Sequence, residues 1–337
     1  MSALVETARG RWSSWDVDEQ PPHSSVLLAL KREKTKATTA FLLDRRGDLV
    51  VVAKVARSRQ GEQVLEQEAA SARCWQEAGW RVARDTCPRV LDHDEGVLWL
   101  SAVPGRSMLV EYLSARHLRR RTAVTADFAR AARWLDDLQL QSRGEAILLP
   151  ELLALHEEAF EQVSELVPEA RGLFAEALES LALACPDGVP STAVHGDFWM
   201  GNLLVDAERV TGVVDLELSS GRGIPLLDVL KLPLSYALYL DTAGRLRPRP
   251  GTWAHLVGFE EVFLGRGHLA RSAEAFVRGR LHRLGIEASA LRAFFPFVLA
   301  QQALLQQHDP VSRDGYAQLL RSLARHRTSS WTWRSLS

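Results

Sequence analysis

Carboxylate and amide side chains gather in one short stretch of the chain, between residues 193 and 217. His195, Asp197 and Asn202 follow one another closely, and Asp215 and Glu217 come soon afterwards. Short apolar runs separate them, so we expect these polar side chains at strand ends and in loops. A metal-assisted phosphoryl-transfer site needs a carboxylate facing the acceptor hydroxyl. It also needs an amide oxygen and a second carboxylate to hold Mg²⁺ on the phosphates. This stretch contains each of these groups.

Two further charges stand on apolar backgrounds nearer the N-terminus. Lys54 interrupts the apolar run 49–56, and Glu68 lies on the apolar face of the helix predicted over 62–77. A buried charge is costly unless it is paired, so the two are expected to form an ion pair. The alternative is that Glu68 is exposed and that Glu66 is the partner of the lysine.

The hydrophobic pattern predicts the elements that must position these residues. A helix is predicted over 62–77, and Pro104-Gly105 marks a boundary after the strands. From Ser107 onward the pattern is helical, notably over 123–140 and 145–187, whereas 1–20 and 328–337 are interpreted as loosely ordered tails. Apolar β-rich runs predict a five-stranded antiparallel sheet over 26–31, 38–43, 49–56, 89–92 and 97–103.

The motif HGDFWMGN, followed by VVDLE and then IPLLDVLKL, resembles the aminoglycoside phosphotransferase/choline kinase family, which has a protein-kinase-like fold. The resemblance covers about residues 25–310 and includes the Asp-x₄-Asn spacing of the kinase catalytic loop. It implies a bilobal α+β fold. A small N-terminal lobe, residues 1–101, would contain an antiparallel sheet plus one helix and bind the nucleotide. A larger, mostly helical C-terminal lobe, residues 102–337, would bind the acceptor, with the nucleotide between the lobes.

The resemblance also implies a role for each matching residue. Asp197 matches the catalytic base, and Asn202 and Asp215 match the Mg²⁺ ligands. Lys54 would hold the nucleotide phosphates with Glu68 positioning it. The implied adenine contacts are Ser101, Ala102 and Val103, and the implied supporting residues are His195, Glu217 and Asp228. The implied reaction moves the γ-phosphoryl group of ATP, or of GTP, to a hydroxyl of a small molecule such as an aminoglycoside, amino sugar, sugar or amino alcohol.

Two departures from the family pattern bear on this reading. The loop over 32–37 has no glycine, although kinases close a Gly-rich loop over the phosphates; Lys34, Thr35, Lys36 or Thr38 would have to serve instead. This loop favours the alternative of a catalytically degenerate, nucleotide-binding regulatory protein. The catalytic motif also carries Trp199, in a pattern that resembles the ketosamine (fructosamine) kinase branch. No DFG or APE-type segment follows Asp215, which disfavours a protein kinase.

Composition limits the remaining function classes. The chain has 337 residues, 46% of them hydrophobic and 25% charged, with a net charge of -1. A near-neutral chain has no global footprint for nucleic acid or a membrane surface. The three cysteines have no CxxC spacing, and no run of 18 apolar residues is present. No long apolar run follows a basic start, so we expect no signal peptide. We therefore expect a cytoplasmic protein, monomeric or homodimeric.

The charge of the acceptor stays open at this point. Residues 145–187 contain ten acidic residues and one basic residue, which favours a cationic acceptor if those acids line its pocket. Residues 266–337 contain eleven arginines against four acids, which would suit an anion instead. Solvated helix faces explain both runs equally well.

Overall fold

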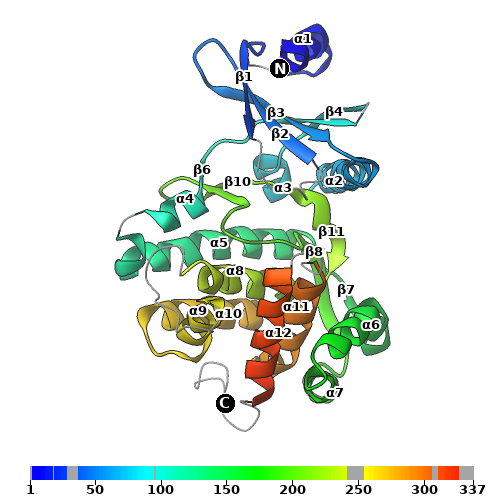
Figure 1. Ribbon diagram of the computed structural model, residues 1–337, viewed down its shortest axis with the longest axis vertical. Coiled ribbons are helices and arrows are strands. Elements are labelled where there is room, and N and C mark those ends of the chain that lie inside the picture. The colour runs from blue at the N-terminus through cyan, green and yellow to red at the C-terminus, as the bar shows by residue number, and fades with distance from the viewer. Residues whose placement is uncertain are drawn as a thin grey trace. The chain divides into compact units, whose positions relative to one another are not determined.

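The computed structural model describes residues 2–17, 19–28, 37–94, 96–114, 116–240, 254–305 and 310–325. The chain forms two compact units. The first consists of Met1–Arg106, His195–Asp197 and Asn202–Gly221, and the second of Ser107–Val194, Phe198–Gly201 and Arg222–Ser337. Strands and helices are mixed, so the predicted α+β class is confirmed (Figure 1).

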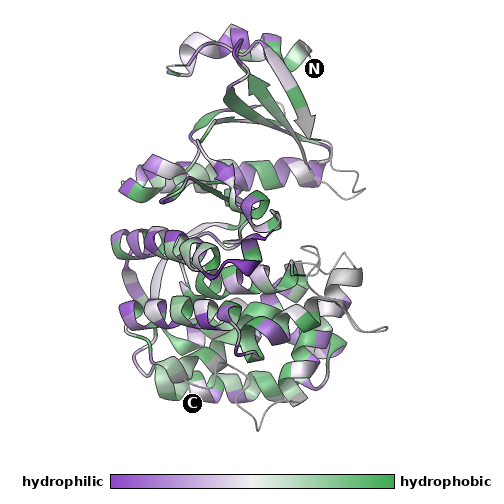
Figure 2. Cartoon of the chain, turned by 90° about the vertical axis from the view of Figure 1, so that its left-hand side faces the viewer, coloured by the Kyte–Doolittle hydropathy of each residue, from purple (hydrophilic) through white to green (hydrophobic). Residues whose placement is uncertain are grey.

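A five-stranded antiparallel sheet forms the centre of the first unit, as the sequence predicts. Its order is β1-β2-β3-β5-β4, with bounds β1 Ser24–Leu28, β2 Ala37–Leu43, β3 Leu49–Ala56, β4 Val90–Asp94 and β5 Val97–Ser101. Strands β2, β3 and β5 are predominantly hydrophobic (Figure 2). Lys54 stands on the central strand β3, opposite Thr39 on β2 and Leu98 on β5. A central strand gives its side chains a well-determined register.

Helix α2, Arg59–Glu77, is the helix that the sequence predicts, and it begins three residues earlier than expected. The reason is an N-cap, because the Ser58 hydroxyl accepts a hydrogen bond from the Gly61 N–H at 3.2 Å. Leu65 and Ala69 of this helix pack with Leu98 and Leu100 of β5. The apolar face of α2 is thus fixed against the sheet.

Two further helices in this unit are not predicted by the sequence pattern. Helix α1, Ser2–Arg11, and the turn η1, Trp12–Ser14, lie where a loose tail was expected, and that expectation is wrong. Ala8 and Trp15 belong to the core of the sheet, and the rings of Trp15 and Trp99 are 5.3 Å apart. Burial of tryptophan stabilises this segment, a tertiary effect that a propensity argument does not register. The other helix is α3, Arg81–Thr86.

The first unit also contains the segment with the candidate chemistry. Strands β9, Leu203–Val205, and β10, Val210–Val213, form an antiparallel hairpin, and the 3₁₀ turn η3, Leu216–Leu218, follows. Asn202 precedes β9 and Asp215 precedes η3. The two polar side chains therefore stand at the same open end of one hairpin.

The second unit is mostly helical. Residues 144–147 were expected to lie next to or within a helix, but they form strand β7, which pairs with β8. Pairing with a neighbouring strand overrides the local preference there. The elements of the second unit are α4 Met108–Leu113, η2 His117–Arg119, α5 Arg121–Gln141, β7 Gly144–Ile147, α6 Leu149–Leu166, α7 Ala170–Ala184, β8 Val189–Val194, α8 Leu226–Leu238, α9 Ala254–Phe259, η4 Glu260–Leu264, α10 His268–Leu284, η5 Ala288–Ala290, α11 Leu291–Leu305 and α12 Pro310–Arg325. The short strands β6, Arg106–Ser107, and β11, Ser220–Gly223, each have residues in both units.

A buried carboxylate ties several of these helices together. Asp127 on α5 is fully buried and accepts hydrogen bonds from Arg130 and from the Tyr236 hydroxyl on α8. The His117 ring contacts the same carboxylate at 2.7 Å. Burial, together with the nearby Asp127 carboxylate, raises the pKa of Tyr236, so this phenol stays protonated as a donor. The buried charge of Asp127 is tolerated because the carboxylate is hydrogen-bonded to the polar groups around it.

None of the described helices is long and apolar enough to span a bilayer. The three cysteines are free thiols. Cys74 is exposed, whereas burial raises the pKa of Cys87 to about 12.

We expect the cysteines to differ sharply in reactivity. The thiolate is the nucleophile, so at about pH 8 the exposed Cys74 should react with a disulfide reagent while Cys87 stays inert. Timed thiol titration of the native protein measures this, and Cys74→Ser should remove the fastest phase. In denaturant all three cysteines should react. Equal rates for Cys74 and Cys87 in the folded protein would contradict the burial described here.

Candidate functional site

The Lys54 ammonium and the Glu68 carboxylate form a close ion pair. Lys54 Nζ lies 2.6 Å from Oε1 and 2.7 Å from Oε2 of Glu68, whose side chain is 2% exposed. The backbone N–H of Leu216 also donates to Glu68. Glu66 is exposed, so the alternative partner is excluded and the predicted Lys54–Glu68 pair is confirmed. Pairing lowers the free-energy cost of burying either charge.

A second carboxylate holds the same lysine from the other side. Lys54 Nζ donates to Asp215 Oδ1 at 2.8 Å, across 161 residues of chain. Burial alone would lower the pKa of Lys54, but Glu68 and Asp215 outweigh it and raise this pKa. Burial opposes ionisation of Asp215, yet Lys54 outweighs that effect and lowers the Asp215 pKa. Lysine and aspartate are therefore both charged at neutral pH.

Asp215 is held in an unusual backbone conformation. Its φ of 69° and ψ of 62° lie in the left-handed region, which costs free energy for a residue with a Cβ atom. The Asp215 side chain is 40% exposed, while the Lys54 side chain next to it is 15% exposed. Strained, partly exposed polar residues are common at functional sites, where the surrounding structure holds them in place.

The His195 ring connects the loop before Asn202 with the segment before Asp215. Nδ1 of His195 accepts a hydrogen bond from the Asp197 N–H at 3.2 Å, and Nε2 lies 3.0 Å from the carbonyl oxygen of Val214. These two partners require the neutral tautomer with its proton on Nε2. The Val214 N–H in turn donates to the Asn202 carbonyl at 3.1 Å. The structure thus gives His195 a bracing position, consistent with its predicted supporting role.

Gly196, between His195 and Asp197, is a position that only glycine fits. Its φ is +79°, and an added Cβ would lie 2.3 Å from the carbonyl oxygen of Leu218. Both the left-handed backbone and the backbone contact exclude a side chain. This close approach positions the loop that carries Asp197.

The amide of Asn202 is oriented by Asp197. Nδ2 of Asn202 donates to the backbone oxygen of Asp197 at 3.1 Å and to Oδ2 of the same residue at 3.3 Å. Asn202 is 6% exposed, and its Oδ1 accepts no hydrogen bond from any residue that the structure describes. An amide oxygen left open in this way, beside an aspartate side chain, suits a hard cation such as Mg²⁺.

The described residues contain no group of three or more His, Cys, Asp or Glu that could hold a metal by themselves. A phosphate-bound Mg²⁺ does not need such a group, because it is typically held by one or two protein oxygens plus substrate phosphates. Asn202 and Asp215 therefore fit the ion that the family implies. Their assignment as metal ligands stays a prediction.

The segment over 101–103 has one free backbone donor. The Ser101 N–H donates to Arg89 at 2.9 Å and the Ala102 N–H to Val50 at 3.3 Å. The Val103 N–H has no hydrogen-bond partner among the described residues. Of the three predicted adenine contacts, Val103 is therefore the one with an N–H to offer, and Ser101 and Ala102 can contribute carbonyl oxygens.

A close contact anchors this segment to the β9–β10 hairpin. The Thr211 hydroxyl on β10 donates to the Pro104 carbonyl at 2.7 Å. Gly105, at φ +123°, approaches so closely that an added Cβ would lie 2.2 Å from Thr211 Oγ1. The predicted adenine contacts and the hairpin that carries Asn202 and Asp215 thus form one packed structure within the first unit.

The remaining predicted residues occupy less informative positions. Glu217 lies on η3 and is half-buried, and Asp228 is 1% exposed on α8 in the second unit. Their supporting roles stay predictions. The glycine-free loop lies outside the described residues over 32–36, so Lys34, Thr35 and Lys36 are not placed, while Thr38 lies on β2.

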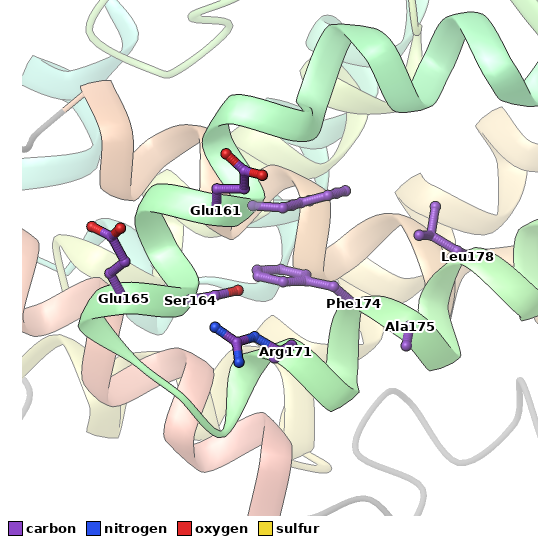
Figure 3. Close-up of a pocket in the computed structure, with 8 residues that line it drawn as sticks. Glu161, Ser164, Glu165, Arg171, Phe174, Ala175 and Leu178 are labelled. Atoms are coloured by element: carbon purple, nitrogen blue, oxygen red, sulfur yellow. The ribbon is translucent and has the colours of Figure 1, made fainter.

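The acidic stretch is divided between different surroundings. Glu151 on α6 pairs with Arg222, whereas Glu161 and Glu165 line a cavity of about 610 Å³ between α6 and α7 (Figure 3). Arg171 lies in the same cavity and offsets part of the acidic charge. These contacts leave the charge of the acceptor open.

Sequence reasoning missed three backbone groups, from two residues, that organise the site. The Leu216 N–H donates to Glu68, and Val214 contacts both His195 and Asn202 through its backbone. Backbone groups leave no signal in residue types. Only the positive φ required at Gly196 had a visible sign, namely the glycine itself.

Comparison with known proteins identifies the family. Residues 34–261 match the model of a phosphotransferase enzyme family, whereas no curated protein matches by sequence. A macrolide 2'-phosphotransferase from Brachybacterium faecium has a similar structure, with a TM-score of 0.52, 17% identity and coverage of 95% of this chain and 98% of that one. A protein described as a candidate fructosamine-3-kinase from Thermobifida fusca is also similar in structure, with a TM-score of 0.55 and 16% identity. That match covers 95% of this chain and 98% of the other one.

The two structural relatives establish the fold, and the family match covers about two thirds of the chain, including every residue of the site described above. The chain belongs to the phosphotransferase enzyme family.

Proposed function

We propose that the protein transfers the γ-phosphoryl group of ATP to a hydroxyl of a small molecule in a Mg²⁺-dependent reaction. The observation that carries this proposal is the position of Lys54 between Glu68 and Asp215. Stability alone does not explain a buried lysine held by two carboxylates, because proteins in which a buried ion pair is replaced by hydrophobic residues are often as stable. Its charge is instead available for nucleotide phosphates.

The chain's own residues divide the work. Lys54 would bind the phosphates, with Glu68 fixing its ammonium group. Asn202 Oδ1 and the Asp215 carboxylate would hold the metal, which neutralises charge on the transferred group. Asp197, half-buried and hydrogen-bonded to Asn202, would orient the acceptor hydroxyl and accept its proton. Phosphoryl transfer is catalysed mostly by positioning and charge neutralisation, and these five residues would provide both.

The acceptor class follows from the family and from the similar structures. Those structures are named for a macrolide and for fructosamine, both of which carry hydroxyl groups. We therefore propose an aminoglycoside, amino sugar, sugar, amino alcohol or macrolide as acceptor. The ring of Trp199 stacks on that of Tyr239 at 5.4 Å, and the half-buried pair offers a flat surface for a sugar ring.

A coupled assay of ADP release tests the proposal. The purified full chain is incubated with ATP, with or without Mg²⁺, and with a panel of neutral, cationic and macrolide acceptors; GTP replaces ATP in a parallel arm. We expect acceptor-dependent turnover that requires Mg²⁺. Saturable ATP binding without turnover on any acceptor would support the degenerate, regulatory alternative. Failure to bind either nucleotide would contradict both.

A further inference from the structure

A groove outside the proposed phosphoryl-transfer site is lined by arginines and no acidic residue. It has a volume of about 310 Å³ and lies in the second unit, between α5 and α10. We call it the α5–α10 groove and define it by six of the residues that line it: Arg121, Thr125, Phe128, Arg271, Phe276 and Arg280.

The two helices run parallel, so their positive ends lie together. Contacts join Thr125 to Ser272, Phe128 to Phe276 and Asp136 on α5 to Arg280, in increasing order along both helices. Neither helix has a side-chain cap or an acidic residue in its first turn. The Glu261 carboxylate does lie beside Gly267, the N-cap of α10. Among the described residues it is therefore the dipole of α5 that has no acidic group in its first turn or cap, and this dipole favours a negative charge.

Arg280 is the strongest indication of a ligand. Its side chain is 8% exposed and its Nε is ion-paired with Asp136 Oδ1 at 2.6 Å, but no described residue accepts a hydrogen bond from either of its terminal nitrogens. Its guanidinium carbon lies 5.6 Å from the centre of the Phe276 ring. A buried guanidinium normally uses its five N–H donors, and here the four on the terminal nitrogens are left for something in the groove.

The charge around Arg280 is not balanced. Asp136 Oδ1 lies 2.6 Å from Arg280 Nε, but Oδ2 of the same carboxylate lies 3.0 Å from Arg283 Nε. One carboxylate thus serves two guanidinium groups. Burial lowers the pKa of Arg280, and Asp136 does not fully offset this. Arg121 and Arg271 add two more positive charges at the open end.

The floor of the groove is apolar. The rings of Phe128 and Phe276 are 5.3 Å apart, and the alanines at 129, 132 and 275 leave the space above them unfilled. The hydroxyls of Thr125 and Ser272, 3.3 Å apart, stand at the open end. Positive charge and hydroxyl donors therefore surround a small apolar surface.

From this arrangement we propose that the α5–α10 groove binds a small organic anion. Its acid group, a carboxylate or a phosphate, meets the arginines and hydroxyls, and its apolar body lies on Phe128 and Phe276. This site is separate from the residues assigned to phosphoryl transfer, so the proposal does not depend on the identity of the acceptor.

Calorimetric titration of the full chain at constant ionic strength tests the proposal with four probes. Benzoate and phenyl phosphate carry both an acid group and an apolar body, acetate lacks the body, and benzylammonium has the opposite charge. We expect benzoate to bind with a dissociation constant below about 1 mM and acetate at least about tenfold more weakly. Comparison of benzoate with phenyl phosphate tells which acid group is preferred.

Two groove variants and two controls locate the binding. The double variant Arg121→Gln/Arg271→Gln removes exposed charges without touching the core, and Ala275→Leu fills the groove while every arginine is kept. Each should weaken benzoate binding at least about tenfold, the double variant by loss of charge-assisted hydrogen bonds and Ala275→Leu because its side chain occupies the space that the benzoate ring needs. Arg278→Gln, on the same helix but outside the groove, should change nothing, and Lys54→Met should leave benzoate binding intact.

Three results would overturn the proposal: no saturable benzoate binding, equal binding of benzylammonium, or benzoate binding unchanged in both groove variants. Loss of benzoate binding in Lys54→Met would assign the anion to the nucleotide site instead and would also overturn it. Turnover measured in the ADP-release assay stays independent of these outcomes, so the two proposals can fail separately.

Discussion

Replacement of Asp197 by asparagine is expected to reduce phosphoryl transfer by about a thousandfold, within the range for loss of a general base. The amide oxygen of the new side chain can still accept the hydrogen bond that Asn202 Nδ2 now donates to Asp197 Oδ2, so the loop should keep its shape. The lost property is the negative charge that orients the acceptor hydroxyl and takes its proton. Steady-state ADP release, with nucleotide affinity measured separately by calorimetry, checks this prediction.

Asp206→Asn is a matched control for this experiment. Asp206 follows β9 in the same part of the chain, and its Oδ1 accepts hydrogen bonds from the N–H groups of Glu208 and Arg209 in an exposed turn. An asparagine can cap the same turn, so this variant should keep wild-type turnover. Loss of nucleotide binding in Asp197→Asn as large as its loss of turnover would contradict a role confined to the acceptor.

The second large effect is expected at Asp215. Asp215→Ala should abolish the stabilisation that Mg²⁺-ATP gives the protein, because it removes a predicted metal ligand and one of the two carboxylates that hold Lys54. A nucleotide at a hundred times its dissociation constant stabilises the native state by about 2.7 kcal/mol, which thermal unfolding detects easily. We expect a rise in Tm for the wild type that requires Mg²⁺, and none for the variant.

Glu208→Gln, an exposed acid on the β9–β10 turn, controls for a general change of charge and should keep the full rise in Tm. The Lys54–Glu68 pair stays intact in Asp215→Ala, so the variant is expected to fold. A Mg²⁺-dependent rise in Tm that survives in Asp215→Ala would exclude Asp215 as a metal ligand. A rise equal with and without Mg²⁺ in the wild type would remove the metal from the proposal.

Much of the site could be predicted because its information is local. The five-residue interval from Asp197 to Asn202 places both side chains on one loop, and the structure joins them by two hydrogen bonds. Glu68 stood out as a charge on an apolar helix face, and its pairing with Lys54 is the physical reason for its presence there. Strand and helix periodicity likewise predicted the sheet and α2 correctly.

Other features depend on contacts that sequence patterns do not contain. Helix α1 is ordered because Ala8 and Trp15 are buried against the sheet, and residues 144–147 form a strand because β8 lies beside them. Each outcome depends on a partner far along the chain, and propensity measures only neighbours.

By itself, then, the sequence determined which residues supply charge and which oxygens are proposed to bind metal, because residue type and short spacing are properties of the chain alone. Only the tertiary structure decided how they meet: the left-handed backbone of Asp215 brings its carboxylate to Lys54, and the His195 ring joins the Asp197 and Val214 backbones. It also decided that Arg280, paired through Nε with Asp136, lines an open groove in which no described residue accepts a hydrogen bond from its terminal nitrogens. The physical reason is that the free energy of these arrangements comes from burial and hydrogen bonds between distant segments, which exist only after the chain has folded.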